Sequence, residues 1–348
     1  MTLRVAVAGA TGYAGGEALR LIAGHPGLAV SALCAGTTRG PIEDYQPHLR
    51  SLAGLHVQET NPETLADADI AILGLPHGAS AAVSAQIAEL NPDCLIVDLG
   101  ADHRLISAED WEAYYGTQAA EPWTYGMPEL IRHTGPTQRE LLAAATHIAA
   151  PGCNASAVTF ASQPAIAAGL ADGTGIVAAL AVGYSGAGKA LKPHLLASEA
   201  LGSAVAYGVG GTHRHIPEIA QNLQAAGATT RSLSFTPVLV PMSRGIHATV
   251  SLPVSAGTTQ EQVWEAYLAA YANEPFISVT SAQPATASVV GANGVLVSPV
   301  LDRDGERITV TCVIDNLGKG TAGAAIQSIN LALGIPETTG LTMNGVAP

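Results

Sequence analysis

Short apolar runs alternate with helix-like segments through the first third of the chain. The apolar runs cover residues 3–8, 30–34, 70–75 and 95–99, and the helix-like segments cover residues 15–23 and 80–90. This order of strand, helix and strand indicates βαβ units, which build a parallel sheet covered by helices. The pattern therefore predicts an α/β domain over residues 1–150.

The pattern changes at about residue 151, where longer β-rich runs begin. These runs cover residues 176–182, 232–239, 247–252 and 307–314, with one helix-like segment at residues 260–271. Such an arrangement is typical of an α+β domain with a mostly antiparallel sheet. A last helix-like run at residues 321–333 follows the final strand, and its periodicity does not say which domain it packs on.

Composition and charge narrow the class of protein. The 348 residues include 15 Lys and Arg against 28 Asp and Glu, a net charge of −13, which argues against a nucleic-acid partner. The uncharged stretch at residues 141–171 contains His147, Pro151 and Asn154, which do not suit a membrane span. The N-terminus runs into a strand pattern with no secretory signal, so we expect a cytoplasmic protein without a membrane partner.

Four cysteines stand at positions 34, 94, 153 and 312 without a CxxC spacing. We therefore expect neither disulfides nor a metal site. Cys153 differs from the other three, because it follows Pro151-Gly152 at the start of an apolar helix. Unpaired N–H groups and the helix dipole lower a thiol pKa at such a position, which favours a nucleophilic thiolate. A buried structural cysteine is the alternative.

A second cluster of chemical groups lies in the segment His213-Arg-His-Ile-Pro-Glu218. Histidine is the usual group for proton transfer near neutral pH, and Arg214 suits a carboxylate or phosphate. Residues i and i+2 of an extended segment point to opposite faces, so at most one of His213 and His215 is expected to face Cys153. The sequence alone does not say which one.

Three further segments suit a nucleotide or an anion. The turn Gly9-Ala-Thr-Gly12-Tyr-Ala-Gly15 joins a strand to a helix, where backbone N–H groups can approach a phosphate. Thr37, Thr38 and Arg39 follow the second strand with no acidic residue, which favours NADP over NAD unless Arg39 is simply an exposed turn residue. The loop at residues 185–188 suits a cofactor or phosphate, and Arg104 follows another strand as a candidate anion ligand.

Together these segments resemble the N-acetyl-gamma-glutamyl-phosphate reductase family, which is related to aspartate-semialdehyde dehydrogenase and more distantly to glyceraldehyde-3-phosphate dehydrogenase. The resemblance covers nearly the whole chain. Its motifs are Gly9-Ala-Thr-Gly-Tyr-Ala-Gly15, Leu75-Pro-His-Gly78, Asp98-Leu-Gly-Ala-Asp-His-Arg-Leu105, Tyr125-Gly-Met-Pro-Glu129, Pro151-Gly-Cys153, Ser185-Gly-Ala-Gly188, His213-Arg-His-Ile-Pro-Glu218 and Asp315-Asn-Leu-Gly-Lys-Gly320. His103 stands where the family usually has Phe, and Arg104 stays in register.

The resemblance implies a Rossmann NADP-binding domain plus an α+β catalytic domain of the glyceraldehyde-3-phosphate dehydrogenase C-terminal type. The terminal helix is expected to return to the Rossmann domain, giving residues 1–150 plus 319–348, with residues 151–318 as the catalytic and oligomerisation domain. It also implies a homodimer or homotetramer.

The site residues implied by the resemblance fall into three groups. Cys153 is the nucleophile, and His215 with Glu218 behind it is the acid/base, with His213 as the runner-up. Arg104, Asn154, Arg214 and His213 are expected at the substrate. The expected cofactor contacts are Gly9, Thr11, Gly12, Tyr13, Ala14, Gly15, Thr37, Thr38, Arg39, Pro76, Ser185, Gly186, Ala187, Gly188 and Asn316.

The implied reaction is NADPH-dependent reduction of N-acetyl-L-glutamyl 5-phosphate to the 5-semialdehyde and phosphate, through a Cys153 thioester, in arginine biosynthesis. One alternative is the same chemistry on the longer aminoadipate analogue of lysine biosynthesis, since one methylene changes binding by only about 1–3 kcal/mol. Another is a non-catalytic NADP-binding sensor. The presence of Cys153 with His215 and Glu218 argues against a sensor, because binding requires none of them.

Overall fold

The apolar runs form two separate sheets in a computed structural model that describes residues 2–346. The described chain divides into two compact units. The first contains residues 2–128, 139–151 and 321–341, and the second contains residues 129–138, 152–320 and 342–346.

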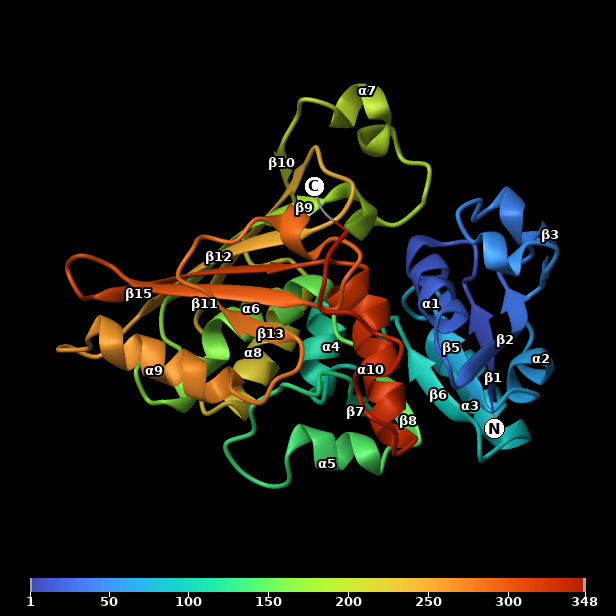
Figure 1. The fold of residues 1–348 in the computed structure, drawn as a ribbon, viewed down its shortest axis with the longest axis horizontal. Coiled ribbons are helices and arrows are strands. Elements are labelled where there is room, and N and C mark those ends of the chain that lie inside the picture. Colours follow the sequence, from blue (N-terminus) through green and yellow to red (C-terminus); the bar gives the residue numbers. More distant parts are fainter. Residues whose placement is uncertain (1, 347–348) are drawn as a thin grey trace. The chain divides into compact units, whose positions relative to one another are not determined.

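The first unit is built on an eight-stranded sheet in the order β3-β4-β2-β1-β5-β6-β8-β7 (Figure 1). Only β3 pairs antiparallel, with β4. The central strands β5 and β6 are buried along their whole length, which explains why all their residues except Asp98 are apolar. The strands are β1 (Leu3–Ala8), β2 (Leu28–Cys34), β3 (Gly40–Pro41), β4 (His56–Gln58), β5 (Ile70–Leu73), β6 (Leu95–Asp98), β7 (Thr124–Tyr125) and β8 (His147–Ala149).

Helices cover this sheet and complete its core. They are α1 (Tyr13–Ala23), α2 (Pro62–Ala66), α3 (Ser80–Leu90), α4 (Ala108–Tyr115), α5 (Gln138–Ala143) and α10 (Gly323–Ala332). The C-terminal α10 packs against α1, and its residues Ile326 and Ile329 lie in the same apolar core as Val5 and Leu19. The chain thus returns to the first unit after leaving the second.

The second unit is built on a seven-stranded sheet in the order β10-β11-β9-β12-β15-β14-β13. β9 with β11 and β13 with β14 pair in parallel, and the remaining neighbours are antiparallel. The strands are β9 (Ile176–Gly183), β10 (Val205–Ala206), β11 (Leu233–Val240), β12 (Ile246–Pro253), β13 (Ile277–Val279), β14 (Val295–Leu301) and β15 (Arg307–Ile314). The helices are α6 (Cys153–Ala167), α7 (Ala197–Ala200), α8 (His215–Ala225) and α9 (Gln260–Tyr271).

Helix α6 is the centre of the second unit. It contacts β12, β14 and β15 on the sheet as well as helices α8 and α9, and every residue from Asn154 to Ile166 is buried. A helix that is apolar or small on all sides is stable only when it is enclosed in this way. Its first residue therefore has a fixed position in the unit.

Two segments depart from the predicted domain boundaries, in addition to shifts of one and two residues that put residue 151 in the first unit and residues 319–320 in the second. Residues 129–138 join the second unit, where Gln163 donates to the Glu129 carbonyl and accepts from the Ile131 N–H. The tail at residues 342–346 also joins it, because Thr342 accepts from the Asn293 N–H and the Val346 N–H donates to Val290. These long-range backbone contacts leave no periodic signal in the sequence.

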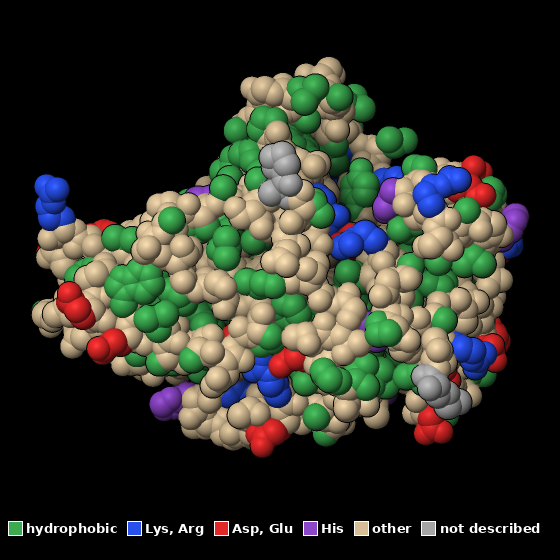
Figure 2. All heavy atoms as spheres, viewed as in Figure 1, with side chains coloured by type: hydrophobic (Ala, Val, Ile, Leu, Met, Phe, Trp, Pro, Cys, Tyr) green, Lys and Arg blue, Asp and Glu red, His purple; other side chains and the backbone are tan. Residues whose placement is uncertain are grey.

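The segment between β9 and α8 carries exposed hydrophobic side chains. Leu191 is 98% exposed, Leu201 is 74% exposed and Leu196 is 51% exposed, and Figure 2 shows hydrophobic side chains over the region of α7. Contiguous exposed apolar surface of this kind often marks a protein interface.

No helix in residues 2–346 combines the length and the hydropathy that crossing a bilayer requires.

Candidate functional site

The thiol of Cys153 lies at the first residue of α6. Gly152 is the N-cap in an extended conformation, no side chain caps the helix, and no acidic residue stands in its first turn. The positive end of the helix dipole is therefore directed at this turn. Cys153 is only partly buried, whereas the other three cysteines are buried.

Two side chains from α8 converge on Gly152, the residue before the cysteine. The Gly152 N–H donates to Glu218 Oε1 at 2.7 Å, and Glu218 is buried. A Cβ atom at position 152 would lie 2.5 Å from His215 Nε2 and 2.8 Å from Glu218 Oε2, so only glycine fits there. The structure thus brings together Cys153, His215 and Glu218 from two segments about 60 residues apart.

His213 has a different environment. Its ring lies 4.8 Å from the ring of His215 and 4.9 Å from Phe235, and its Nδ1 accepts from the His215 N–H at 3.0 Å. Burial, with a smaller contribution from the Arg214 charge, lowers the pKa of His213 to about 4. His213 is therefore neutral at pH 7, with one ring nitrogen occupied by the backbone.

The two histidine rings are neighbours rather than on opposite faces. The expectation of an extended segment was wrong here, because Arg214 has helical dihedrals (φ −60°, ψ −18°) and α8 begins at His215. Arg214 itself is exposed.

Tyr207 belongs to this cluster, although the sequence did not single it out. Asn154 Nδ2 donates to the Tyr207 hydroxyl at 3.4 Å, and burial, followed by the nearby Cys153 charge, raises the pKa of Tyr207 to about 12. Asn154 is 2% exposed, and its Oδ1 has no hydrogen-bond partner among the described residues. The only sequence signal for Tyr207 is its place in a glycine-rich stretch before His213.

Asn316 and the loop at residues 185–188 lie together. Asn316 Oδ1 accepts from the Gly245 N–H at 2.8 Å, and its Nδ2 donates to Ser185 Oγ at 2.9 Å. Asp315 beside it is fully buried and pairs with Arg244 at 2.9 Å. The predicted loop and the predicted asparagine therefore form one hydrogen-bonded group.

Arg104 lies in the first unit and is buried. Its Nε donates to the Ala150 carbonyl at 2.7 Å, and its Nη2 donates to the Leu99 carbonyl at 2.9 Å. These bonds hold the end of β8, three residues before Cys153 along the chain. The neighbouring His103 stacks on Trp123 with ring centroids 3.6 Å apart, and burial lowers its pKa.

The first glycine turn of the first unit is built for close backbone approach. Gly9 has φ +78°, and a Cβ at Gly9 would overlap the carbonyl of Gly74 after β5. A Cβ at Gly15 would overlap the Gly9 carbonyl. The N-cap of α1 is Gly12, with no side-chain cap and no acidic residue in the first turn. This helix end lies where β1 and β5 leave the sheet side by side, which suits a phosphate.

The turn after β2 differs from its prediction in one respect. Thr37 and Arg39 are exposed, but the Arg39 guanidinium contacts the carboxylate of Glu59, which follows β4. No acidic residue stands within the turn, yet the fold supplies one from 20 residues away. Sequence spacing gave no indication of Glu59.

A buried carboxylate holds the loop that contains Pro76. Asp102 accepts from the N–H groups of Gly78, Ser80 and Ala81 at 2.7, 3.0 and 3.2 Å. These donors form the N-terminus of α3, so the loop after β5 has a fixed course.

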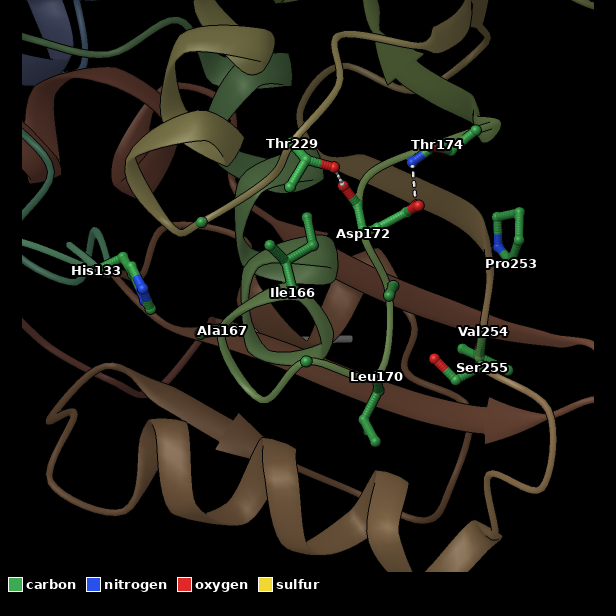
Figure 3. A pocket seen from close by; sticks show the side chains of 13 residues that line it. His133, Ile166, Ala167, Leu170, Asp172, Thr174, Thr229, Pro253, Val254 and Ser255 are labelled. Atoms are coloured by element: carbon green, nitrogen blue, oxygen red, sulfur yellow. Dashed lines mark hydrogen bonds between the residues drawn. The ribbon is translucent and has the colours of Figure 1, made fainter.

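A separate cavity of about 610 Å³ lies at the opposite end of α6 (Figure 3). His133, Leu170 and Ser255 are among its lining residues, and Asp172 there is hydrogen-bonded to Thr174 and Thr229. Since α6 has 15 residues, this cavity is about 20 Å along the helix from Cys153. None of the predicted site residues lines it.

Two family models match the chain. "Semialdehyde dehydrogenase, NAD binding domain" matches residues 4–135, and "Semialdehyde dehydrogenase, dimerisation domain" matches residues 153–316. The fold class predicted from the sequence is confirmed by these matches and by the two sheets.

Curated relatives match over the full length. A protein of Leifsonia xyli subsp. xyli named N-acetyl-gamma-glutamyl-phosphate reductase is 54% identical over 351 residues, covering 100% of both chains. A protein of Streptomyces avermitilis with the same name is 52% identical over 351 residues, again covering 100% of both.

Solved structures with low sequence identity share the fold. Aspartate semialdehyde dehydrogenase II of Vibrio cholerae, complexed with ASA, is similar with a TM-score of 0.68 and 17% identity, covering 96% of this chain and 98% of that chain. Aspartate semialdehyde dehydrogenase with NADP from Candida albicans is similar with a TM-score of 0.66 and 15% identity, covering 95% and 98%.

The cysteine environments predict selective labelling. Burial raises the pKa of Cys34 and Cys94 to about 11 and that of Cys312 well above its usual range, whereas Cys153 is partly exposed at a helix N-terminus. We expect iodoacetamide to alkylate Cys153 at least about tenfold faster than the others at pH 7. Peptide mass spectrometry measures this, with Cys153→Ser as the control. Equal rates at all four positions would contradict it.

Proposed function

Because the chain belongs to the N-acetyl-gamma-glutamyl-phosphate reductase family, we propose that it reduces N-acetyl-L-glutamyl 5-phosphate with NADPH to N-acetyl-L-glutamate 5-semialdehyde and phosphate, with Cys153 as the nucleophile. The observation that carries the proposal is the placement of Cys153 at the first turn of α6, with His215 and Glu218 beside the preceding glycine. The reaction is a reductive step of arginine biosynthesis.

Cys153 begins the reaction. Its sulfur attacks the acyl carbon of the substrate, a C–S bond forms, and the bond to the phosphate oxygen breaks so that phosphate leaves with the electron pair. The product of this step is a thioester on Cys153. Sulfur donates poorly into the carbonyl, so a thioester accepts a hydride more readily than an oxygen ester does, which is the reason for cysteine rather than serine.

His215 transfers the proton in this scheme. It takes the thiol proton as the C–S bond forms and returns it to the sulfur when the aldehyde departs. His213 is less suited to this role, because its pKa of about 4 keeps it neutral and its Nδ1 accepts from the His215 backbone. Glu218 orients the turn by accepting from Gly152, and we assign it a supporting role behind His215.

The first turn of α6 stabilises the negative charge that develops on the substrate oxygen. The N–H groups of Cys153 and Asn154 lie in the first turn of α6, where the N-cap residue Gly152 has no side chain that could accept from them. Such preorganised donors at a helix N-terminus stabilise an oxyanion. We place Asn154 at the substrate, because its buried Oδ1 has no partner among the described residues, and Tyr207 fixes the orientation of its amide.

NADPH, when bound, supplies the hydride that reduces the thioester. In the first unit the turn from Gly9 to Gly15 would hold its pyrophosphate, since the glycines leave room and the α1 N-terminus has no competing carboxylate. Thr37, Thr38 and Arg39 would hold the 2′-phosphate, and Pro76 would lie beside the cofactor. In the second unit Asn316 and the loop at residues 185–188 would contact the nicotinamide end of the cofactor. The hydrogen bond between Asn316 and Ser185 holds this loop in place. Arg104 stays a predicted substrate ligand.

The alternatives are less favoured. The curated relatives carry the glutamyl name rather than that of an aminoadipate enzyme, and a sensor would not need the arrangement around Cys153.

A dimerisation domain spans residues 153–316, and the exposed Leu191, Leu196 and Leu201 lie within it. We therefore propose a homodimer or homotetramer in which a second copy covers these side chains.

The activity is tested most directly in the reverse direction. We expect purified protein to reduce NADP in the presence of N-acetylglutamate semialdehyde only when phosphate is present, followed as absorbance of NADPH. Cys153→Ser should lower the rate by about 10³-fold or more, because a hydroxyl is a far weaker nucleophile at neutral pH. Activity with the aminoadipate homologue alone would overturn the substrate assignment, and an active Cys153→Ser variant would overturn the nucleophile.

Single substitutions of His213 and His215 distinguish the roles of the two histidines. His215→Asn should lower kcat by about 10²–10⁴-fold, the usual contribution of a general acid/base. His213→Asn should change kcat much less, because His213 is already neutral above about pH 5. The reverse pattern would assign the proton transfer to His213.

The preference for NADP depends on Arg39 in this proposal. Arg39→Ala should raise KM for NADP about fivefold while leaving KM for NAD nearly unchanged, a modest effect because the guanidinium is exposed. Glu59→Gln is the matched variant, since it removes the carboxylate that pairs with Arg39, and it should lower KM for NADP. An equal effect of Arg39→Ala on both cofactors would show that Arg39 does not bind the 2′-phosphate.

A further inference from the structure

Lys319 has no role in the reaction described above, although it belongs to the motif Asp315-Asn-Leu-Gly-Lys-Gly320. Its side chain is 1% exposed, and its Nζ lies 2.6 Å from Oε1 of Glu129, which is 0% exposed. Taking two such charges out of water costs as much as their attraction returns, so stability alone is a weak reason for a buried pair. The position of the Lys319–Glu129 pair in the second unit gives a better reason for its presence.

The ammonium group lies against the helix that carries the nucleophile. Nζ is 5.6 Å from the ring centroid of Phe160 and 5.7 Å from that of Phe276. Phe160 is seven residues after Cys153 on α6, about two turns, so the two residues share one face about 10 Å apart along the axis. The ion pair thus supports α6 on the face of Cys153.

The backbone next to Lys319 approaches Cys153 closely. Lys319 lies in the π-helical turn Gly318–Ala322, and a Cβ atom at the next residue, Gly320, would be only 2.7 Å from the Cys153 Cβ. The Gly320 N–H donates to the Asp315 carbonyl at 2.9 Å. A small shift of this turn would therefore change the space around the thiol directly.

Two buried groups hold the turn. Asp315 Oδ1 accepts from the N–H groups of Leu317 and Gly318 at 2.9 and 3.0 Å, which fixes the start. Lys319, bound to Glu129, fixes the middle. A π-helical turn is rare in proteins and is frequently found at functional sites.

We propose that the Lys319–Glu129 ion pair is a positioning pair for the nucleophile: it fixes the π-helical turn against Cys153 and so sets the geometry and reactivity of the thiol. The inference rests on the proposed role of Cys153. Neither residue touches the reacting atoms, so their effect is transmitted through Gly320 and α6.

The deciding variant is the double substitution Lys319→Met with Glu129→Leu. Removing both charges avoids a lone buried charge, so this variant is expected to fold with a Tm close to that of the wild type. Its kcat should nevertheless fall about tenfold or more, with KM for NADP within about twofold, because displacement of a reacting group by a fraction of an ångström is costly. The rate at which iodoacetamide alkylates Cys153 across pH 6–9 should change in parallel.

The matched control is the ion pair between Arg139 and Glu337 in the first unit, 3.0 Å apart and partly buried. Arg139→Met with Glu337→Leu should leave kcat and Cys153 alkylation unchanged whatever its effect on Tm. If Lys319→Met alone fails to fold, the double variant still decides the question.

The outcomes separate this inference from the proposed function. A double variant that keeps the wild-type kcat and alkylation profile overturns the positioning role. A wild-type protein whose Cys153 is no more reactive than Cys34 and Cys94 overturns the proposed nucleophile instead. A lowered Tm with unchanged kcat would show a purely structural pair and also overturns the inference.

Discussion

The enclosure of α6 is the constraint on which the second unit depends. Its small and apolar residues allow sheet strands and two helices to pack on it from several sides, so its N-terminus cannot move without disturbing the whole core. Close packing makes such a core resist even small displacements. Cys153, at the first position of this helix, is therefore held in place by the core, while the same position leaves it partly open to solvent.

Glycines then define the space around the cysteine. A Cβ atom at Gly152 would lie too close to His215 and Glu218, and one at Gly320 would lie too close to Cys153. A side chain at either position would push these groups apart. The space around Cys153 therefore depends on glycines, which have no Cβ atom, as well as on the side chains present. This agrees with the short glycine motifs that carry much of the family resemblance.

Buried carboxylates in both units are bound to backbone N–H groups or to a cation. The second unit contains a buried carboxylate at Gly152, the Arg244–Asp315 pair and the Lys319–Glu129 pair, and each carboxylate is bound to backbone N–H groups or to a cation. Buried charges without such partners would be too costly to retain. In the first unit Asp102, a buried carboxylate, accepts from N–H groups at the N-terminus of α3, and the turn after β1 offers a second helix N-terminus. One helix end is thus filled by the protein, and the other is free of carboxylates.

The sequence by itself determined the features that depend on neighbours along the chain. The helix predicted at residues 260–271 is the observed α9, and the positions of the Gly9 turn and of Cys153 at a helix start were predictable because periodicity and turn chemistry are local. Only the tertiary structure decided which distant groups meet. Tyr207 joins Asn154, Glu59 joins Arg39, and Glu129 joins Lys319 across 190 residues, since each pairing depends on the packing of whole elements. The choice between His213 and His215 as acid/base was likewise open, because it depends on burial and on the point where α8 begins.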